Sequence, residues 1–203
     1  MESNKYQAQV KRLLTKAFQS AGYKITKDLE LDSVPESVKY DGLTLSIDGK
    51  KIVYRKGKIT ADRPGAFLAI WKRPALNSMN GNKPIALTAD DLDYLFVQIQ
   101  SHDESEIEAS PQKILRGMFI FPVSILIEKG IITSDHKKGK TGFRVFAPWS
   151  QDRGLEGTKV FSASGKKTQS WQAPYFVEIT ESGEIDSTQL NKIFSKEYKK
   201  SSL

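Results

Sequence analysis

The first 22 residues carry an apolar stripe with the period of an α-helix, and the pattern then changes to that of strands. The stripe consists of residues three or four positions apart: Val10, Leu13, Leu14, Ala17, Phe18 and Ala21. Gly22 follows the stripe, and glycine is the residue that most often stands just beyond the end of a helix. The sequence therefore predicts a helix over residues 7–21.

The rest of the chain predicts a mixture of short strands and a few helices. Residues 43–47 and 51–54 alternate around Asp48-Gly49, which is a strong hairpin signal. Further strands are predicted at 66–71, 94–99, 118–121 and 143–146, helices at 123–129 and about 187–199, and a basic turn at 165–168. The run at 66–71 is almost entirely apolar, which is typical of a strand buried on both faces. Because strands and helices mix without a βαβ rhythm, we expect an α+β fold with a central mixed β-sheet flanked by helices.

Composition limits the function classes open to this chain. Its 203 residues, 38% of them hydrophobic, suit a single domain over 1–203. No apolar run approaches the roughly 20 residues that a membrane span needs, and the start lacks a signal-peptide pattern, so we expect a cytoplasmic address. The absence of cysteine excludes disulfides and cysteine zinc sites. The two histidines, His102 and His136, are far apart in sequence, which makes a histidine-rich metal site or a Ser-His-Asp triad a poor expectation for this chain.

The charge is unevenly distributed along the chain. The net charge is +7, yet residues 84–112 contain seven acids and no Lys or Arg, so the remainder carries +14. A basic body favours an anionic partner such as nucleic acid or an anionic membrane surface. Ordinary solvated lysines are the alternative.

The three tryptophans share one setting, because each stands near basic or amide side chains and a proline. Aromatic rings beside cations bind phosphate backbones and exposed bases, but the same rings also cap a hydrophobic core. We expect Trp71 to pack in the core, because it stands at the end of a predicted buried strand. Trp149 and Trp171 lie beside loops and remain candidates for ligand contact.

Basic side chains that leave apolar strands are the main candidates for phosphate contact. Lys72 and Arg144 each emerge from an apolar setting, where a long side chain either reaches solvent or meets an anion. Gln169 and Gln172 have the chemistry to bond sugar or base edges. Pairing of Lys72 or Arg144 with the acidic segment is the alternative. The candidate nucleic-acid-binding residues are Arg55, Lys58, Lys72, Arg73, Arg144, Trp149, Lys166, Lys167, Gln169, Trp171 and Gln172.

Two aspartates form a candidate metal site. Asp91 and Asp93 stand two positions apart where a strand begins, so both carboxylates would point to one side and suit a divalent cation. A polar start to the strand, without a metal, is the alternative.

Motifs in the middle of the chain resemble the MepB family of bacterial proteins. They occur in a consistent order from about Leu43 to Phe176. The residues that carry the resemblance are Lys58-Ile59-Thr60, Gly65-Ala66-Phe67, Ile70-Trp71-Lys72-Arg73, Asp91-Leu92-Asp93, Met118-Phe119-Ile120-Phe121-Pro122, Lys129-Gly130-Ile131, Gly142-Phe143-Arg144-Val145-Phe146, Pro148-Trp149 and Lys167-Thr168-Gln169-Ser170-Trp171-Gln172. The resemblance implies a fold similar to that of type II restriction endonucleases, with DNA as a candidate ligand.

Nucleases of that fold need an acid on one strand and acid-x-Lys on the next, to hold Mg²⁺ and orient water. Acid-x-Lys occurs here at Asp48-Gly49-Lys50, Asp135-His136-Lys137 and Glu197-Tyr198-Lys199, in a predicted turn, a loop and the terminal helix. The apolar strand that should carry it has Ile70 in the place of the acid. We therefore expect a degenerate site.

Three hypotheses follow for the function. The first is a non-catalytic, DNA-binding module with a basic groove and no cofactor. The second is a metal-dependent nuclease or phosphodiesterase that uses Mg²⁺ held by Asp91 and Asp93. The third is a protein-interaction or effector domain that docks through the acidic stretch 103–108.

Overall fold

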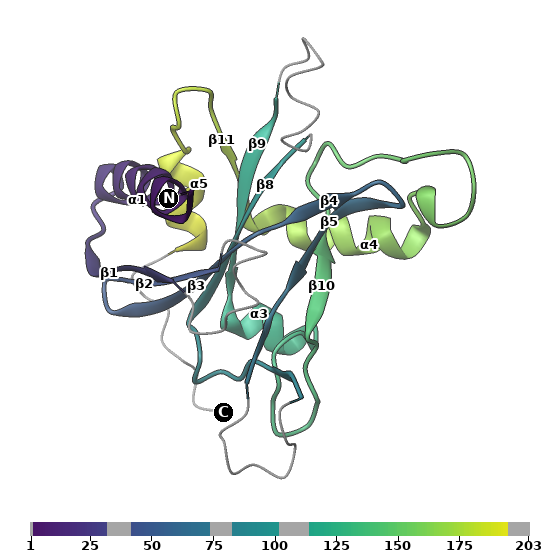
Figure 1. Cartoon of the computed structure of the whole chain (residues 1–203), viewed down its shortest axis with the longest axis horizontal. Coiled ribbons are helices and arrows are strands. Elements are labelled where there is room, and N and C mark those ends of the chain that lie inside the picture. Colours follow the sequence, from purple (N-terminus) through teal and green to yellow (C-terminus); the bar gives the residue numbers. More distant parts are fainter. Residues whose placement is uncertain (1, 32–41, 74–82, 102–113, 195–203) are drawn as a thin grey trace.

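The computed structural model describes residues 2–31, 42–73, 83–101 and 114–194. Its centre is a six-stranded sheet in the order β1-β2-β3-β8-β9-β11 (Figure 1). The strands are β1 (Ile25–Leu31), β2 (Leu43–Ile47), β3 (Lys50–Lys56), β8 (Tyr94–Gln100), β9 (Arg116–Pro122) and β11 (Phe176–Ile179). Strands β3 and β8 run parallel, and the other neighbouring pairs run antiparallel. The sheet is therefore mixed, and the predicted α+β class is confirmed.

Two helices cover one face of the central sheet. They are α1 (Glu2–Ser20) and α5 (Ser187–Ile193), which lie together on the left in Figure 1. Phe18 of α1 stacks on Phe96 of β8 with ring centroids 5.4 Å apart, and Phe194 packs edge-on against Phe18 at 5.1 Å. The apolar stripe found in the sequence is thus the contact surface of α1, and the helix predicted over 7–21 is confirmed.

The second face of the sheet is covered by a smaller sheet and two helices. The smaller sheet has the order β10-β5-β4, formed by β10 (Gly142–Val145), β5 (Arg63–Ala69) and β4 (Lys58–Thr60). The helices are α3 (Val123–Glu128) and α4 (Ala163–Gln172). Short elements complete the fold: β6 (Trp71–Lys72), β7 (Ile85–Ala86), η2 (Gly157–Lys159) and η3 (Ala173–Tyr175).

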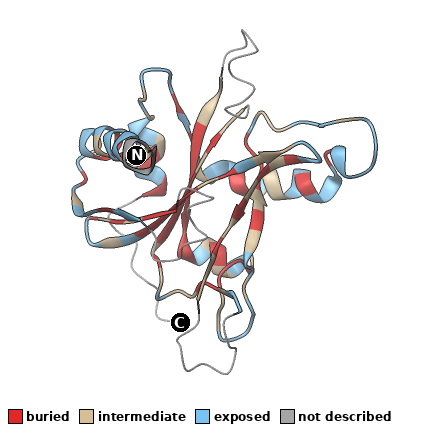
Figure 2. Cartoon of the chain, viewed as in Figure 1, coloured by how far each residue is buried: buried red, intermediate tan, exposed pale blue. Residues whose placement is uncertain are grey.

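The central strands are buried on both faces, because each face carries its own hydrophobic cluster. In β8, Phe96 belongs to the cluster under α1, whereas Leu95 and Val97 belong to the cluster under the smaller sheet. Figure 2 shows this burial concentrated in the middle of the molecule. The continuous apolar runs of β8 and β9 are explained by this double coverage.

Two predictions about local structure are wrong. In β5, buried Ala66 and Leu68 alternate with half-buried Phe67 and Ala69, so that strand is covered fully on one face only. Residues 165–168 are not a turn but part of helix α4. That helix begins because Ser162 caps it, with the Ser162 hydroxyl accepting a hydrogen bond from the Gly165 N–H at 3.1 Å.

The other predicted elements agree with the structure where it describes them. The five remaining strands and the helix after Pro122 are present, and the final helix is seen over Ser187–Ile193. The predicted extension of that helix to 199 and the acidic stretch 103–108 lie outside the described residues. None of the helices in the described ranges is long and apolar enough to cross a membrane.

Candidate nucleic-acid interface

Two of the predicted contact residues are buried. Arg55 is only 2% exposed, and its Nη1 donates to the Tyr54 carbonyl at 2.8 Å. Gln172 is fully buried, and its amide bonds the backbone of the neighbouring strand. The prediction that these two side chains face a ligand surface is therefore wrong.

Gln172 and Gln169 attach helix α4 to the end of β10. The Gln172 Oε1 accepts from the Phe146 N–H at 2.8 Å, and the Gln172 Nε2 donates to the Arg144 carbonyl at 3.0 Å. One turn earlier, the Gln169 Nε2 donates to the Ala147 carbonyl at 2.6 Å. Both amides therefore position the helix and are already engaged in these bonds.

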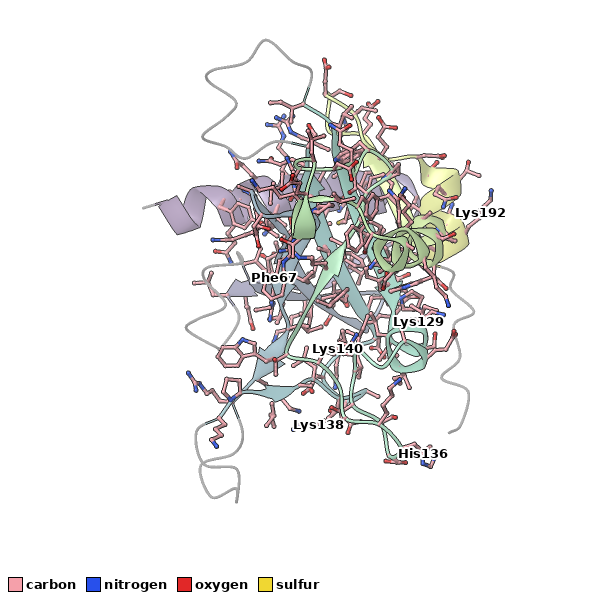
Figure 3. The ribbon with its side chains drawn as sticks, turned by 90° about the vertical axis from the view of Figure 1, so that its right-hand side faces the viewer. Phe67, Lys129, His136, Lys138, Lys140 and Lys192 are labelled. Atoms are coloured by element: carbon pink, nitrogen blue, oxygen red, sulfur yellow. The ribbon has the colours of Figure 1, made fainter. Side chains whose placement is uncertain are left out.

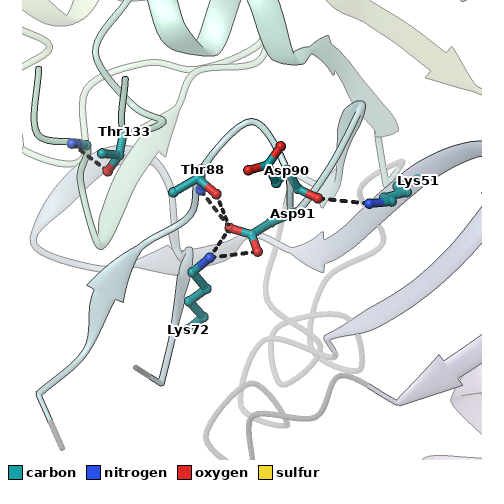
Figure 4. Close-up of polar contacts among 7 residues, drawn as sticks. Lys51, Lys72, Thr88, Asp90, Asp91 and Thr133 are labelled. Carbon is teal, nitrogen blue, oxygen red and sulfur yellow. Dashed lines mark hydrogen bonds and ion pairs between the residues drawn. The ribbon is translucent and has the colours of Figure 1, made fainter. Parts of the chain in front are cut away.

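Lys72 forms an ion pair with Asp91, which is the pairing with the acidic segment that the sequence left open. The Lys72 Nζ lies 2.7 and 2.8 Å from the two Asp91 carboxylate oxygens (Figure 4). The Thr88 N–H donates to Asp91 Oδ2 at 2.7 Å, and the Thr88 hydroxyl donates to the same oxygen at 3.0 Å. The pair joins β6 to the turn before β8.

Asp93 has a separate backbone role. Its Oδ2 accepts from the Lys51 N–H at 2.8 Å, and its own backbone N–H donates to the Lys51 carbonyl at 2.8 Å. The Asp93 carbonyl accepts from the Val123 N–H at 2.9 Å, where α3 begins. Within the described ranges, no cluster of three or more His, Cys, Asp or Glu side chains could hold a metal. Asp91 and Asp93 each engage different elements.

The Asp91 carboxyl should make stability depend on pH at the acidic end. Partial burial raises the pKa of Asp91, but hydrogen bonds from Lys72 and Thr88 outweigh it and hold the pKa below its ordinary value. A lowered folded-state pKa stabilises the fold above the unfolded pKa of about 3.9, and this contribution is lost as the pH falls through the folded pKa.

We therefore expect Asp91→Asn to cost about 1–2 kcal/mol of unfolding free energy at pH 7 and progressively less below about pH 4. Urea denaturation at several pH values measures this difference. The exposed Asp90, changed to Asn, is the matched control and should show no such trend. A constant cost for Asp91→Asn from pH 7 to pH 3 would contradict the assignment.

A basic groove runs between helix α4 and strand β10. It consists of two cavities of about 480 and 380 Å³, and both are lined by Arg144 and Phe146. Helix α4 lines one side with Gly165 and Thr168 of successive turns and with Trp171 near its end. We call these two adjoining cavities the α4–β10 groove. It brings two predicted contact residues, Arg144 and Trp171, to one place.

Arg144 stands where the two cavities meet. Its Nη2 donates to the Thr60 hydroxyl at 2.8 Å, and its Nη1 lies 3.3 and 3.5 Å from the carbonyls of Pro64 and Gly65. Burial lowers the pKa of Arg144, and the nearby Asp62 charge partly offsets that effect. Among the described residues, no carboxylate forms a direct ion pair with this guanidinium. The acceptors of the Arg144 guanidinium are therefore neutral groups, namely one hydroxyl and two backbone carbonyls.

The lining of the groove is cationic and aromatic. Its other charged residues are Arg63 in the larger cavity and Lys129 and Lys140 in the smaller one. The Lys129 Nζ lies 5.8 Å from the centre of the Trp171 ring. Acids lie close by, since Glu128 pairs with Lys129 at 2.7 Å and Asp62 with Arg63 at 3.3 Å, but these are exposed pairs of small energy.

The same side of the molecule carries further basic residues. Figure 3 turns this side toward the viewer and labels Lys129, Lys138, Lys140 and His136 on it. Lys166 and Lys167 are exposed on α4. The sequence did not single out Lys129, Lys138 or Lys140 as contact residues, because a lysine after a helix or in a loop has no distinguishing pattern.

The remaining predicted contacts lie elsewhere. Lys58 is exposed on β4, and the Arg73 guanidinium lies 5.0 Å from the Trp71 ring centre. Trp71 is half-buried and belongs to neither hydrophobic cluster. Trp149 packs edge-on against Phe176 at 5.4 Å and lines a different cavity. The structure thus divides the predicted residues among separate surfaces.

Comparisons with known proteins agree on one family. The MepB-like family model matches residues 34–178. A solved crystal structure of MepB is similar, with a TM-score of 0.58 and 29% sequence identity, over 76% of this chain and 87% of that one. No curated protein matches the chain.

Proposed function

Since this chain belongs to the MepB-like family, we propose that it binds nucleic acid, DNA in the first instance, in the α4–β10 groove and does not cleave it. Phosphates would be neutralised by the cations of the groove, and an exposed base would stack on Trp171. Aromatic side chains on which bases stack, beside a positively charged groove, are typical of proteins that bind single-stranded nucleic acid. The expected ligand is therefore a single-stranded segment.

The observation that carries the proposal is the position of Arg144. A partly buried guanidinium costs free energy unless an anion or hydrogen-bond acceptors compensate it. Here the acceptors are neutral, and the group lies at the junction of two cavities whose other charged lining residues are cations. A phosphate in the groove would complete this arrangement with a charge-assisted hydrogen bond.

The dimensions of the groove suit a short segment. Helix α4 rises about 1.5 Å per residue, so the side from Ser162 to Trp171 extends roughly 13 Å. Stacked nucleotides rise about 3.4 Å each, so the groove has room for three or four of them.

Binding without cleavage is supported by the engagement of the two aspartates. Asp91 is bound to Lys72 and Thr88, and Asp93 to the Lys51 backbone. A degenerate restriction-endonuclease-like fold is part of the same proposal. Its support is the mixed central sheet, in which the polar side chains at the end of β8 are Gln98 and Gln100. Their neutral amides cannot supply the negative charge that the metal site of a nuclease needs. An assay with Mg²⁺ or Mn²⁺ should leave DNA intact.

The binding test uses fluorescence anisotropy with labelled single-stranded and duplex DNA over a range of salt concentrations. We expect affinity to fall steeply with salt. The Lys129→Ala/Lys140→Ala variant should reduce the slope of log K against log salt by about 0.7 for each phosphate of a single strand that is no longer neutralised.

Lys27→Ala is the matched control, because Lys27 is an exposed lysine on β1, far from the groove in the fold. It should bind as the parent protein does. Absence of binding at low salt, or equal binding by the double variant, would remove the proposal.

A further inference from the structure

A third cavity, of about 310 Å³, lies on the other side of β10 from the groove. Val145 lines this cavity, whereas its neighbours Arg144 and Phe146 line the groove. Adjacent residues of a strand point to opposite faces, so the two sites are separate. We call this third site the β8 cavity, because Gln100 and Ser101 at the end of β8 line it.

The β8 cavity is placed where sheets often bind ligands. In the described part of the central sheet, β3 and β8 form the parallel pair, and the cavity lies at the carboxyl end of β8. Crevices at the carboxyl ends of parallel strands are recurrent ligand sites. The floor of the cavity is apolar, with Ile59, Ala66 and Ile99 among its lining residues.

The polar groups of the cavity have unused hydrogen-bonding capacity. The structure gives the side chains of Gln100, Gln151 and Arg153 no hydrogen-bond or ion-pair partner among the described residues. An amide has two donors and two acceptor sites, which matches the mixed edge of a nucleobase. Arg153 presents a fork of donors that suits a phosphate. Trp149, half-buried in the wall, adds an aromatic surface.

The charge and volume define the ligand further. Arg153 is the charged residue that lines the cavity in the described part of the chain, so the site favours an anion. A volume of about 310 Å³ lies at the lower end of ordinary ligand pockets, which run from about 300 to 1,000 Å³. One nucleotide, and not a longer strand, is of suitable size.

From these features we infer that the β8 cavity binds a single nucleotide. Gln100 and Gln151 bond the edge of its base, Trp149 contacts its ring, and Arg153 holds its phosphate. The nucleotide is either free or an unpaired residue of a nucleic acid. This inference does not depend on the α4–β10 groove, because different residues form the two sites.

Isothermal titration calorimetry of the full chain with AMP, GMP, CMP and UMP tests the inference. We expect at least one of the four to bind at a single site, and Arg153→Ala to weaken it about tenfold, the effect of losing one charge-assisted hydrogen bond. Trp149→Phe should abolish most of the tryptophan quenching that accompanies binding. Arg12→Ala, an exposed arginine on helix α1 that lies outside both sites, is the matched control and should leave mononucleotide affinity unchanged.

Three results would overturn the inference: no mononucleotide binding at millimolar concentration, equally tight binding of ribose 5-phosphate, or an unaltered affinity in Arg153→Ala. The groove is tested separately through Lys129 and Lys140, so failure at one site is distinguishable from failure at the other. Competition identifies the source of the nucleotide. Displacement of a labelled oligonucleotide by the mononucleotide assigns the site to a residue of nucleic acid, and simultaneous binding assigns it to the free nucleotide.

Discussion

Gly117→Ala is expected to lower the free energy of unfolding by about 3 kcal/mol, because a methyl group has no room there. Gly117 lies in β9 beside β11. An added Cβ would lie 2.0 Å from Cζ of Phe176, 2.4 Å from its Cε2 and 2.9 Å from the Val177 carbonyl oxygen. The Phe176 ring is held between Phe119, at 5.0 Å, and Trp149, at 5.4 Å, so it has little freedom to turn aside.

A double-mutant cycle measured by urea denaturation separates this collision from other effects. In a Phe176→Ala background the ring is absent, and Gly117→Ala should then cost less than about 1 kcal/mol. The same small cost in the parent protein would contradict the expectation, since it would mean that the ring moves without loss.

Gln172→Leu is expected to cost a similar amount, roughly 3 kcal/mol, for a different reason. Leucine fills the space but leaves the Phe146 N–H and the Arg144 carbonyl without their partners. An orphaned buried polar group costs about 1–3 kcal/mol. Because the Gln172 amide joins α4 to β10, the groove between them should also widen, and affinity for nucleic acid should fall with stability.

Gln169→Leu is the matched control for this substitution. Its amide bonds one backbone group, the Ala147 carbonyl, in a partly buried place, so about 1 kcal/mol is expected. Urea denaturation of both variants measures the difference. Equal costs would show that the two hydrogen bonds of Gln172 contribute no more than the one of Gln169.

Much of the architecture followed from local patterns. The stripe from Val10 to Ala21 predicted helix α1, and Asp48-Gly49 predicted the β2–β3 hairpin, in which both residues have positive φ. The central strands were predicted because an apolar run such as Tyr94–Ile99 is stable only where both faces are covered. These signals are local, since each depends on residues within one element or one turn.

The candidate site was less predictable. Residues 165–168 combine glycine with lysines, a composition typical of a turn, yet Ser162 caps a helix there. Glycine suits position 165 in this helix because a Cβ would lie 2.7 Å from the Phe161 ring. Arg55, Lys72 and Arg144 were equivalent in sequence, each a cation beside apolar residues. In the structure, Arg55 is buried, Lys72 forms an ion pair with Asp91, and Arg144 lies in the groove.

The order of its residues alone specifies helix α1, the β2–β3 hairpin and the central buried strands β8 and β9 of this protein. It also specifies membership of the MepB-like family, because periodicity and motifs are properties of neighbouring residues. The partners and the burial of each charged or amide side chain were set by the tertiary structure, because they depend on elements distant in the chain. Gln172 accepts a hydrogen bond from a backbone N–H that lies 26 residues away in the sequence. Arg144 donates to Thr60 across 84 residues, and Lys72 donates to Asp91 across 19 residues. Long-range contacts of this kind follow from packing, which sets the local charge and solvent exposure that a groove needs.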